Sequence, residues 1–155
     1  MVYLAIPMEI RIANHYDFER LKKIDHLSIN PERVTFIERV VTSGTAWVVS
    51  IRAEVVAYAV LDRSYFERPT IAMLLVDSKR RRCGIGNQLV EYLERICGGP
   101  ELWTSTNLSN TPMQRLLVKR GYHLTGFIDN LDSGDPELFY FKKLDQNKPV
   151  QASCA

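Results

Sequence analysis

The sequence predicts a single domain of the α/β class, α+β in the stricter sense, and three observations support this. The chain has 155 residues, which is close to the usual size of one domain with a full core. Segments with the two-residue period of strands are interspersed along it with segments that have helical periodicity. Its apolar and charged fractions, 46% and 25%, are those of a globular protein rather than of a disordered or membrane-spanning one.

The first half of the chain predicts a strand, two helices and a hairpin. Residues 10–12 alternate and predict a short strand, and apolar residues at helical spacing predict a helix over 16–26. A second helix is expected over 30–42, because Asn-Pro-Glu supplies an N-cap, a proline at the first helical position and an early acid. Residues 45–50 and 54–61 predict the two strands of a hairpin.

The second half alternates between strands and helices. Its apolar first strand is expected to be buried on both faces, because it shows no polar alternation. In order, we expect a strand at 70–76, a helix marked by Leu89, Leu93 and Ile96, a strand at 101–106, a helix at 110–121, and strands at 122–128 and 138–144. The last ten residues are polar and without periodicity, which indicates a tail.

The segment between the strand at 70–76 and the following helix carries the clearest chemical signal. A basic stretch, Lys79–Arg82, is followed by Gly84 and Gly86, which open an amphipathic helix. Such a loop directs backbone N–H groups at one point near the positive end of a helix dipole, so it attracts a phosphate or pyrophosphate. A Cβ at either glycine would obstruct that approach. A Walker loop is excluded because Asn87 follows, and a Rossmann fingerprint because position 89 is Leu.

Composition excludes several other classes of function. A net charge of +2 is too small for a general nucleic-acid binder. Cys83, Cys97 and Cys154 are odd in number and lack metal-ligand spacing, so we expect no disulfide framework, no metal and a reducing cytoplasm. Residues 1–8 lack a basic n-region, and no stretch approaches membrane-spanning length, so neither a signal peptide nor a membrane partner is expected.

The pattern R-x-x-G-x-G at 81–86 resembles the pyrophosphate loop of the GNAT family of acyl-CoA-dependent N-acetyltransferases. The order of predicted elements is similar to that of a whole GNAT domain and would place it at 1–145, with a tail at 146–155. The helix from Asn110 to Gly121-Tyr122 resembles a second family segment, N-x-x-A-x-x-L-Y-x-x-x-G-F. The resemblance implies a central, twisted, mixed but mostly antiparallel sheet of about seven strands with helices on both faces. It also implies acetyl-CoA as co-substrate.

The resemblance also implies which residues bind the coenzyme. The backbone of Leu74, Leu75 and Val76 would bind the pantetheine arm, and the N–H of Leu75 or Val76 would stabilise the oxyanion. Arg81 stands at the family's Arg/Gln position. The remaining implied contacts are Arg82, Cys83, Gly84, Ile85, Gly86 and Asn87 for the pyrophosphate, and the side chains of Asn107 and Asn110. Asn110 is also a natural helix N-cap.

The sequence departs from the family at its acid and base. The tyrosine that often protonates the leaving thiolate aligns with Leu117, and the base glutamate of some members aligns with Ser105. A thioester is already activated, so a neutral amine, close approach and an oxyanion donor are the main requirements. A water relay could remove the proton. The candidate side chains for acid or base catalysis are Tyr140, Tyr122, Tyr58, Tyr65, His123 and Ser105. Each aromatic side chain among them could instead simply pack in or beside the core.

We expect an N-acetyltransferase that transfers an acetyl group directly to a primary amine in a ternary complex. Asp129 and Asp132, with Asp135 and Glu137, form an acidic connection that could attract a cationic acceptor or could be a solvated loop. The sequence leaves open whether the acceptor is a small molecule or a peptide, and whether the protein forms a homodimer. Alternatives are a protein N-terminal or lysine acetyltransferase, a non-catalytic acyl-CoA-binding module, and a nucleic-acid binder using Lys79–Arg82.

Overall fold

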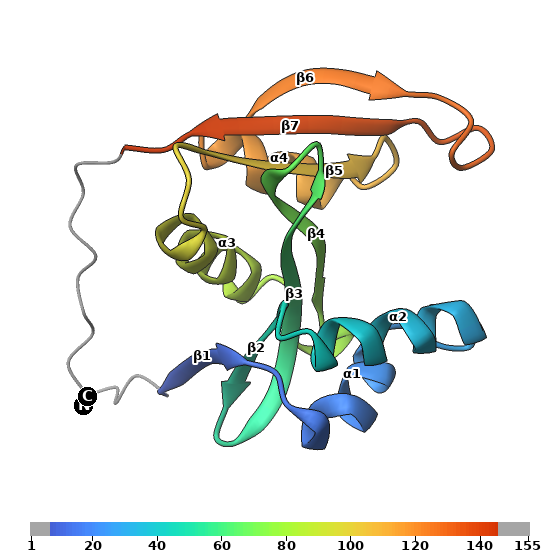
Figure 1. Ribbon diagram of the computed structural model, residues 1–155, viewed down its shortest axis with the longest axis vertical. Helices are drawn as coiled ribbons and strands as arrows, with labels where there is room; N and C mark the ends of the chain where they lie inside the picture. The colour runs from blue at the N-terminus through green and yellow to red at the C-terminus, as the bar shows by residue number, and fades with distance from the viewer. Residues whose placement is uncertain (1–6, 146–155) are drawn as a thin grey trace. The chain divides into compact units, whose positions relative to one another are not determined.

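The computed structural model describes residues 7–145 (Figure 1). Its elements follow the expected order of strands and helices, with two additional 3-10 turns. They are β1 (Met8–Ile12), η1 (His15–Asp17), α1 (Phe18–Ile24), α2 (Pro31–Thr42), β2 (Ala46–Ile51), β3 (Glu54–Tyr65), β4 (Arg68–Val76), η2 (Ser78–Arg80), α3 (Ile85–Ile96), β5 (Glu101–Asn107), α4 (Thr111–Lys119), β6 (His123–Ile128) and β7 (Glu137–Lys143).

The strands form one seven-stranded mixed sheet in the order β1-β2-β3-β4-β5-β7-β6. The pairs β1–β2, β2–β3, β5–β7 and β6–β7 are antiparallel, whereas β4 and β5 are parallel, with Thr70 opposite Trp103 and Ile71 opposite Thr104. A parallel pair needs a crossover, and α3 lies in the chain between β4 and β5. The expected mixed, mostly antiparallel sheet is therefore confirmed.

The chain divides into two compact units. Unit 1 consists of the residues up to Leu61 and Met73–Tyr92, and unit 2 of Asp62–Ala72 and the residues from Leu93 onwards. The expected single domain at 1–145 stays a prediction. The expected tail at 146–155, and Cys154 with it, lies outside the described residues.

Unit 1 has a core of aliphatic side chains with one buried tyrosine. Leu21 and Ile24 of α1 and Ile37 of α2 are buried against Val48 of β2 and Tyr58 of β3. Burying an aliphatic side chain of this size contributes about 1.5–3 kcal/mol, so this packing holds the two helices on the sheet. The predicted N-cap of α2 is present, since the Asn30 side chain accepts a hydrogen bond from the Glu32 N–H at 2.9 Å.

Most expected elements differ from the observed ones at one end or both, and the differences at α1, β3 and β6 are the most informative. The helix expected over 16–26 is a 3-10 turn followed by α1, because Asn14 and Asp17 form a reciprocal capping box that starts the turn at His15. β3 continues to Tyr65 instead of ending at Leu61. Tyr122 precedes β6, because its N–H closes the end of α4 by donating to Leu117 O at 3.0 Å.

The prediction that the strand at 70–76 is buried on both faces was wrong for most of its length. Burial holds for Thr70 and Ile71, but Ala72 is exposed and the residues after it are half-buried. Met73 and Leu75 pack on the core of unit 1. Because successive strand residues point to opposite faces, Leu74 and Val76 are directed away from that core.

Candidate functional site

The loop from Asp77 to Gly84 in unit 1 is shaped by local caps and by left-handed backbone. The Asp77 carboxylate accepts from the Lys79 N–H at 2.9 Å and so starts η2. Arg82 and Gly84 have φ values of +62° and +77°. The left-handed region is costly for residues with a Cβ, so the turn favours glycine at position 84.

The start of α3 leaves donors directed out of the helix. At this end of α3 the Gln88 N–H donates to Gly84 O at 3.1 Å, so the N–H groups of Ile85 and Gly86 precede the ladder of helical hydrogen bonds. A Cβ built at Gly84 would meet no atom within 4 Å, so the space beside the loop is open. Open space next to helix N-terminal donors is suited to an oxyanion.

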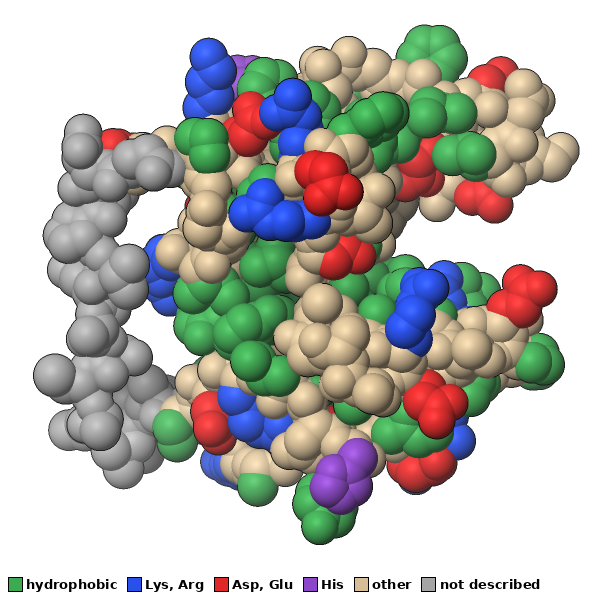
Figure 2. Space-filling model, in the orientation of Figure 1, with side chains coloured by type: hydrophobic (Ala, Val, Ile, Leu, Met, Phe, Trp, Pro, Cys, Tyr) green, Lys and Arg blue, Asp and Glu red, His purple; other side chains and the backbone are tan. Residues whose placement is uncertain are grey.

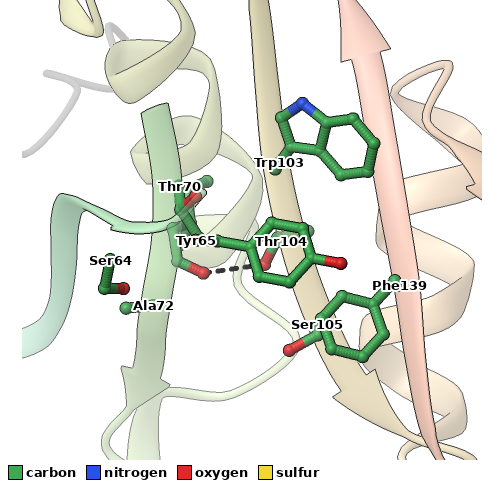
Figure 3. Close-up of a pocket in the computed structure, with 9 residues that line it drawn as sticks. Ser64, Tyr65, Thr70, Ala72, Trp103, Thr104, Ser105 and Phe139 are labelled. Atoms are coloured by element: carbon green, nitrogen blue, oxygen red, sulfur yellow. Dashed lines mark hydrogen bonds between the residues drawn. The ribbon is translucent and has the colours of Figure 1, made fainter. Parts of the chain in front are cut away.

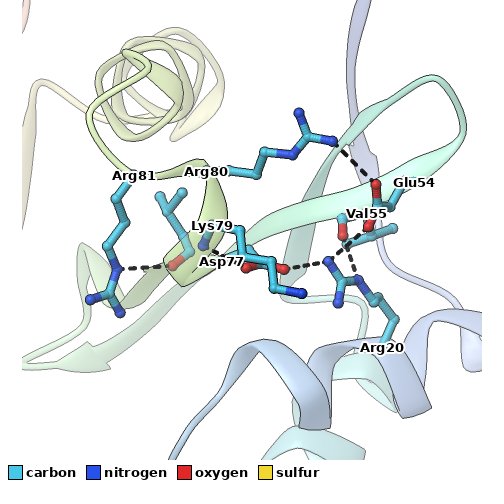
Figure 4. A network of polar contacts seen from close by, with 8 residues as sticks. Arg20, Glu54, Val55, Asp77, Lys79, Arg80 and Arg81 are labelled. Atoms are coloured by element: carbon cyan, nitrogen blue, oxygen red, sulfur yellow. Dashed lines mark hydrogen bonds and ion pairs between the residues drawn. The ribbon is translucent and has the colours of Figure 1, made fainter.

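A network of charges anchors the base of this loop (Figure 4). Arg20 of α1 pairs with the Asp77 carboxylate at 2.5 Å and with Glu54 at 3.2 Å, and its Nε donates to Val55 O at 2.8 Å. The Lys79 N–H and the Arg20 guanidinium hold the pKa of Asp77 below its ordinary value, against a smaller opposing effect of burial. Arg20 therefore ties the strand end and the loop start to α1. No sequence pattern indicated its role.

The basic stretch Lys79–Arg82 is divided among different partners. Arg80 pairs with Glu54 at 3.4 Å, and the Arg81 Nε donates to Val76 O at 3.4 Å. The side chains of Lys79 and Arg82 are exposed. Cys83 is also exposed, and its thiol lies 3.5 Å from Arg81 O. Part of the positive charge is thus neutralised locally, which favours a small anion site over a broad basic surface.

The end of β4 has a defined backbone orientation. The Asp77 N–H donates to Val56 O of β3 at 2.8 Å. Adjacent strand residues direct their N–H groups to opposite sides, so Val76 and Leu74 direct theirs away from β3, whereas Leu75 directs its own toward β3. Of the two expected oxyanion donors, this alternation favours Val76.

The expected contacts Asn107 and Asn110 lie in unit 2 and have local partners there. The Asn107 amide donates to the Asp132 carboxylate at 2.9 Å and to Asp135 O at 3.3 Å. Asn110 caps α4 by accepting from the Met113 N–H at 3.3 Å, which confirms its structural role. Both asparagines are thus positioned by the fold, and their role toward a coenzyme stays a prediction.

Two carboxylates of the acidic connection between β6 and β7 accept hydrogen bonds that hold the connection in place. Asp135 accepts from the Ser109 hydroxyl at 2.5 Å and from the Ser109 N–H at 2.9 Å, and Asp129 accepts from the Asn130 N–H at 2.8 Å. In Figure 2 acidic and hydrophobic side chains gather over this end of β6 and β7. The exposed apolar residues there are Phe127, Ile128 and Leu131.

Two of the candidate tyrosines are buried beside carboxylates. The Tyr58 hydroxyl donates to the fully buried Asp25 at 2.6 Å. The Tyr122 hydroxyl has no hydrogen-bond partner among residues 7–145, although it lies in the field of Glu94. Burial, followed by the adjacent carboxylate, raises the pKa of both phenols far above the ordinary value. Neither tyrosine can act as a base near neutral pH.

Tyr140, His123 and Leu117 lie in three different environments in unit 2. Tyr140 is buried, and burial raises its pKa. It lies on the opposite face of β7 from Phe139, because neighbouring strand residues alternate. His123 is exposed on β6. Leu117, at the family's tyrosine position, is fully buried in α4.

Ser105 and Tyr65 are brought together in a pocket of about 200 Å³ in unit 2 (Figure 3). The rings of Trp103 and Phe139 form the aromatic part of its wall with Tyr65. Tyr65 and Phe139 are stacked, with ring centroids 5.0 Å apart and an interplanar angle of 26°. No sequence pattern indicated this pocket, because its walls come from four strands that are separated along the chain.

Two further features bear on the class of protein. Within the described range, no helix is long and apolar enough to cross a membrane. The same residues contain no group of three or more His, Cys, Asp and Glu side chains that could hold a metal ion.

Comparisons with known proteins agree with this geometry. The model of the acetyltransferase (GNAT) family matches residues 11–122. No curated protein matches the chain. Among solved structures, a GNAT-family acetyltransferase from Bacillus cereus is 24% identical with a TM-score of 0.79, covering 90% of this chain and 99% of that one.

Two other solved structures are similarly related. YncA from Salmonella typhimurium, with its cofactor acetyl-CoA, is 19% identical with a TM-score of 0.71, covering 94% of this chain and 98% of that one. A ribosomal-protein-alanine N-acetyltransferase from Brucella melitensis is 20% identical with a TM-score of 0.72, covering 88% of this chain and 99% of that one. At these identities the similarity shows the fold, and the family model shows the family.

Proposed function

The chain belongs to the GNAT acetyltransferase family, and on that premise we propose that it transfers the acetyl group of acetyl-CoA directly to a primary amine in a ternary complex. The observation that carries this proposal is the open loop at Gly84, with the N-terminal donors of α3 beside it. Acetyl-CoA-dependent acetyl transfer is the chemistry of the family. The acceptor class and the residue roles are our own proposals.

The pyrophosphate would bind at the loop from Arg81 to Asn87. The residues fit such a group, because Gly84 leaves open space and the backbone N–H groups of Ile85 and Gly86 precede the helical ladder. Arg82 adds an exposed cation beside them. The ion pair between Arg20 and Asp77 fixes where the loop begins, so Arg20 is a positioning residue for this site.

The oxyanion that develops on the thioester carbonyl would be stabilised by the Val76 N–H. Support comes from the Asp77–Val56 hydrogen bond, which orients that N–H away from β3. Leu74 shares this orientation and would bind the pantetheine arm. A backbone donor held by a sheet needs no reorganisation when charge develops, and one such donor accounts for about 10²–10³ in rate in other enzymes.

The acceptor nitrogen would attack the thioester carbonyl carbon, forming a C–N bond while the C–S bond breaks and CoA leaves as its thiolate. A thiol has a pKa of about 8.5, so the thiolate can leave without a strong acid. The excess proton of the attacking amine would pass to water. The serine at the family's glutamate position, Ser105, and the raised pKa values of Tyr58 and Tyr122 favour this route over a side-chain base.

Two alternatives are distinguished by their outcomes. A protein N-terminal or lysine acetyltransferase would acetylate peptides and leave small amines unmodified. A non-catalytic acyl-CoA-binding module, which Leu117 and Ser105 favour, would bind acetyl-CoA without transferring it. Nucleic-acid binding through Lys79–Arg82 is disfavoured, because Arg80 and Arg81 have partners in the protein. It would give a steep salt dependence.

The test combines binding and turnover. Acetyl-CoA and the non-reactive desulfo-CoA should each raise the melting temperature of the protein by mass action. CoA release should then be followed over a panel of small amines, peptides and proteins. Absence of any thermal shift at millimolar acetyl-CoA would reject the coenzyme site. A clear shift without acetylation of any acceptor would favour the binding module.

A further inference from the structure

The pocket around Tyr65 is built for an apolar planar group. It has a volume of about 200 Å³, and its walls include the rings of Tyr65, Trp103 and Phe139 (Figure 3). An apolar cavity of about 150 Å³ is sufficient for benzene. The pocket therefore has room for a single aromatic ring with a short substituent, and it is too small for a larger ring system with several substituents.

The rings are held in fixed positions before any ligand binds. Tyr65 stacks on Phe139, and its centroid lies 5.7 Å from that of Trp103. Trp103 stacks in turn on Phe141 at 5.1 Å, and its indole N–H donates to the Glu101 carboxylate at 3.0 Å. A further ring can join such an array by offset or edge contacts, which contribute beyond the burial of their area.

The polar atoms of the pocket do not form a site for an ammonium group. None of its nine lining residues is charged. The hydroxyls of Ser64, Thr70 and Thr104 donate to Asp62, Arg68 O and Ile71 O at 2.7, 2.8 and 3.0 Å. An ammonium group placed there would lose water without gaining a counter-charge, which is unfavourable.

Two hydroxyls remain for a ligand. Neither Tyr65 nor Ser105 has a hydrogen-bond partner for its side-chain oxygen within the part of the chain that the structure describes. They can accept or donate one hydrogen bond each at the edge of a bound ring. The pocket thus combines aromatic walls with a small number of polar groups, which is the usual composition of a small-molecule site.

From these observations we infer that the acceptor is a small primary amine whose carbon chain carries a single aromatic ring, and that this ring binds in the pocket against the rings of Tyr65, Trp103 and Phe139. The inference rests on the proposed acetyl transfer. Ala72 lines the pocket and belongs to β4, the strand that also carries Leu74 and Val76. The pocket selects the ring, whereas the amine end of the molecule stays outside it.

The test compares 2-phenylethylamine with n-butylamine, two primary alkylamines that differ by the ring. We expect kcat/KM to be at least about tenfold higher for 2-phenylethylamine, since burial of one ring readily accounts for such a factor. Phe139→Leu should reduce this ratio about fivefold, mainly through the KM for the aromatic amine. Phe127→Leu is the matched control, because Phe127 is an exposed phenylalanine of the same unit outside the pocket. It should leave the ratio unchanged.

A ratio near one in the wild-type protein, or an equal reduction by both variants, would overturn the inference while leaving acetyl transfer itself intact. If no amine is acetylated, the proposed function fails, and the pocket is then tested by direct calorimetric binding in the presence of desulfo-CoA. Tighter binding of 2-phenylethylamine than of butylamine, lost in Phe139→Leu, would still support a ring site. Equal binding of the two amines would reject it.

Discussion

The loop at Asp77–Gly84 and the pocket around Tyr65 present their binding groups in opposite ways. The loop offers backbone N–H groups from consecutive residues, next to open space and a network of charges. The pocket offers side chains from four strands, with ring centroids 5.0–5.7 Å apart and no charged residue in its walls. One site suits an anion, and the other suits a neutral ring.

The difference shows how each site depends on its surroundings. The loop needs a special backbone conformation at a few consecutive positions, so the replacement of a single glycine can disrupt that conformation. The pocket needs the strands to align in register, so that Trp103 lies opposite Phe141 and Ser105 opposite Phe139. Changes in the loop should therefore abolish binding outright, whereas changes in the pocket should alter selectivity.

The largest expected effect is that of Gly84→Asp, which puts bulk and negative charge at the proposed phosphate site. We expect acetyl-CoA affinity to fall more than about 100-fold, so that the thermal shift disappears. Gly134→Asp is the matched control, because Gly134 also has a positive φ and open space around it but lies in the β6–β7 connection. If both variants kept the shift, the loop would not be the coenzyme site.

The second prediction tests whether the stability of unit 2 can be lowered without changing the selectivity of the pocket. Burial by itself would raise the pKa of Glu94, but hydrogen bonds from Arg120 and Lys142 outweigh it and hold the pKa below its ordinary value. Glu94→Gln should cost about 2 kcal/mol at pH 7 and lower the melting temperature by about 6 °C, since it removes the negative charge that Arg120 and Lys142 share in a largely buried cluster.

The sign of the pH dependence follows from the lowered pKa. The stabilisation by Glu94 is present above the unfolded-state pKa of about 4.3 and is lost as the pH falls through the lower folded-state value. The difference between wild type and Glu94→Gln should therefore shrink below about pH 4. The exposed Glu38 provides the control substitution. An unchanged preference for ring amines in Glu94→Gln is expected, and a changed one would link the cluster to the pocket.

The third prediction concerns Arg20, which contacts the loop only through Asp77. Arg20→Gln should raise the KM for acetyl-CoA about fivefold with a smaller change in kcat, because the start of the loop loses its anchor. Arg68→Gln, which removes an exposed ion pair with Glu101 in unit 2, should leave this KM within about twofold. A fall in kcat alone would assign Arg20 to a different step.

The smallest effect is expected from neutralising the acidic connection. The double variant Asp129→Asn, Asp132→Asn should raise the KM for a cationic amine about twofold, an effect that salt should screen, and leave acetyl-CoA affinity unchanged. Equal changes for both substrates would indicate a folding defect, since Asp132 accepts a hydrogen bond from Asn107. If neither changed, these charges would serve only to hold the connection.

Sequence periodicity predicted most elements but not the connection between β3 and β4. That turn has Phe66 and Glu67 at φ values of +49° and +58°. Two-residue hairpin turns of this kind usually carry Asn or Gly, so the pattern gave no turn signal and the end of β3 was placed too early. The hairpin forms anyway, because the sheet contributes more than the local cost of two left-handed residues.

The sequence by itself determined the backbone conformation of the loop at Asp77–Gly84, the order of the elements and the helix caps, because each depends on residues within one or two turns of each other. Gly84, Asn30 and Asn110 act on their own neighbours in the chain. Only the tertiary structure decided the anchoring of Asp77 by Arg20 and the meeting of Tyr65 with Phe139, which are separated by 57 and 74 positions in the chain. Such contacts depend on strand register and helix packing, and neither leaves a local pattern in the residues that finally touch.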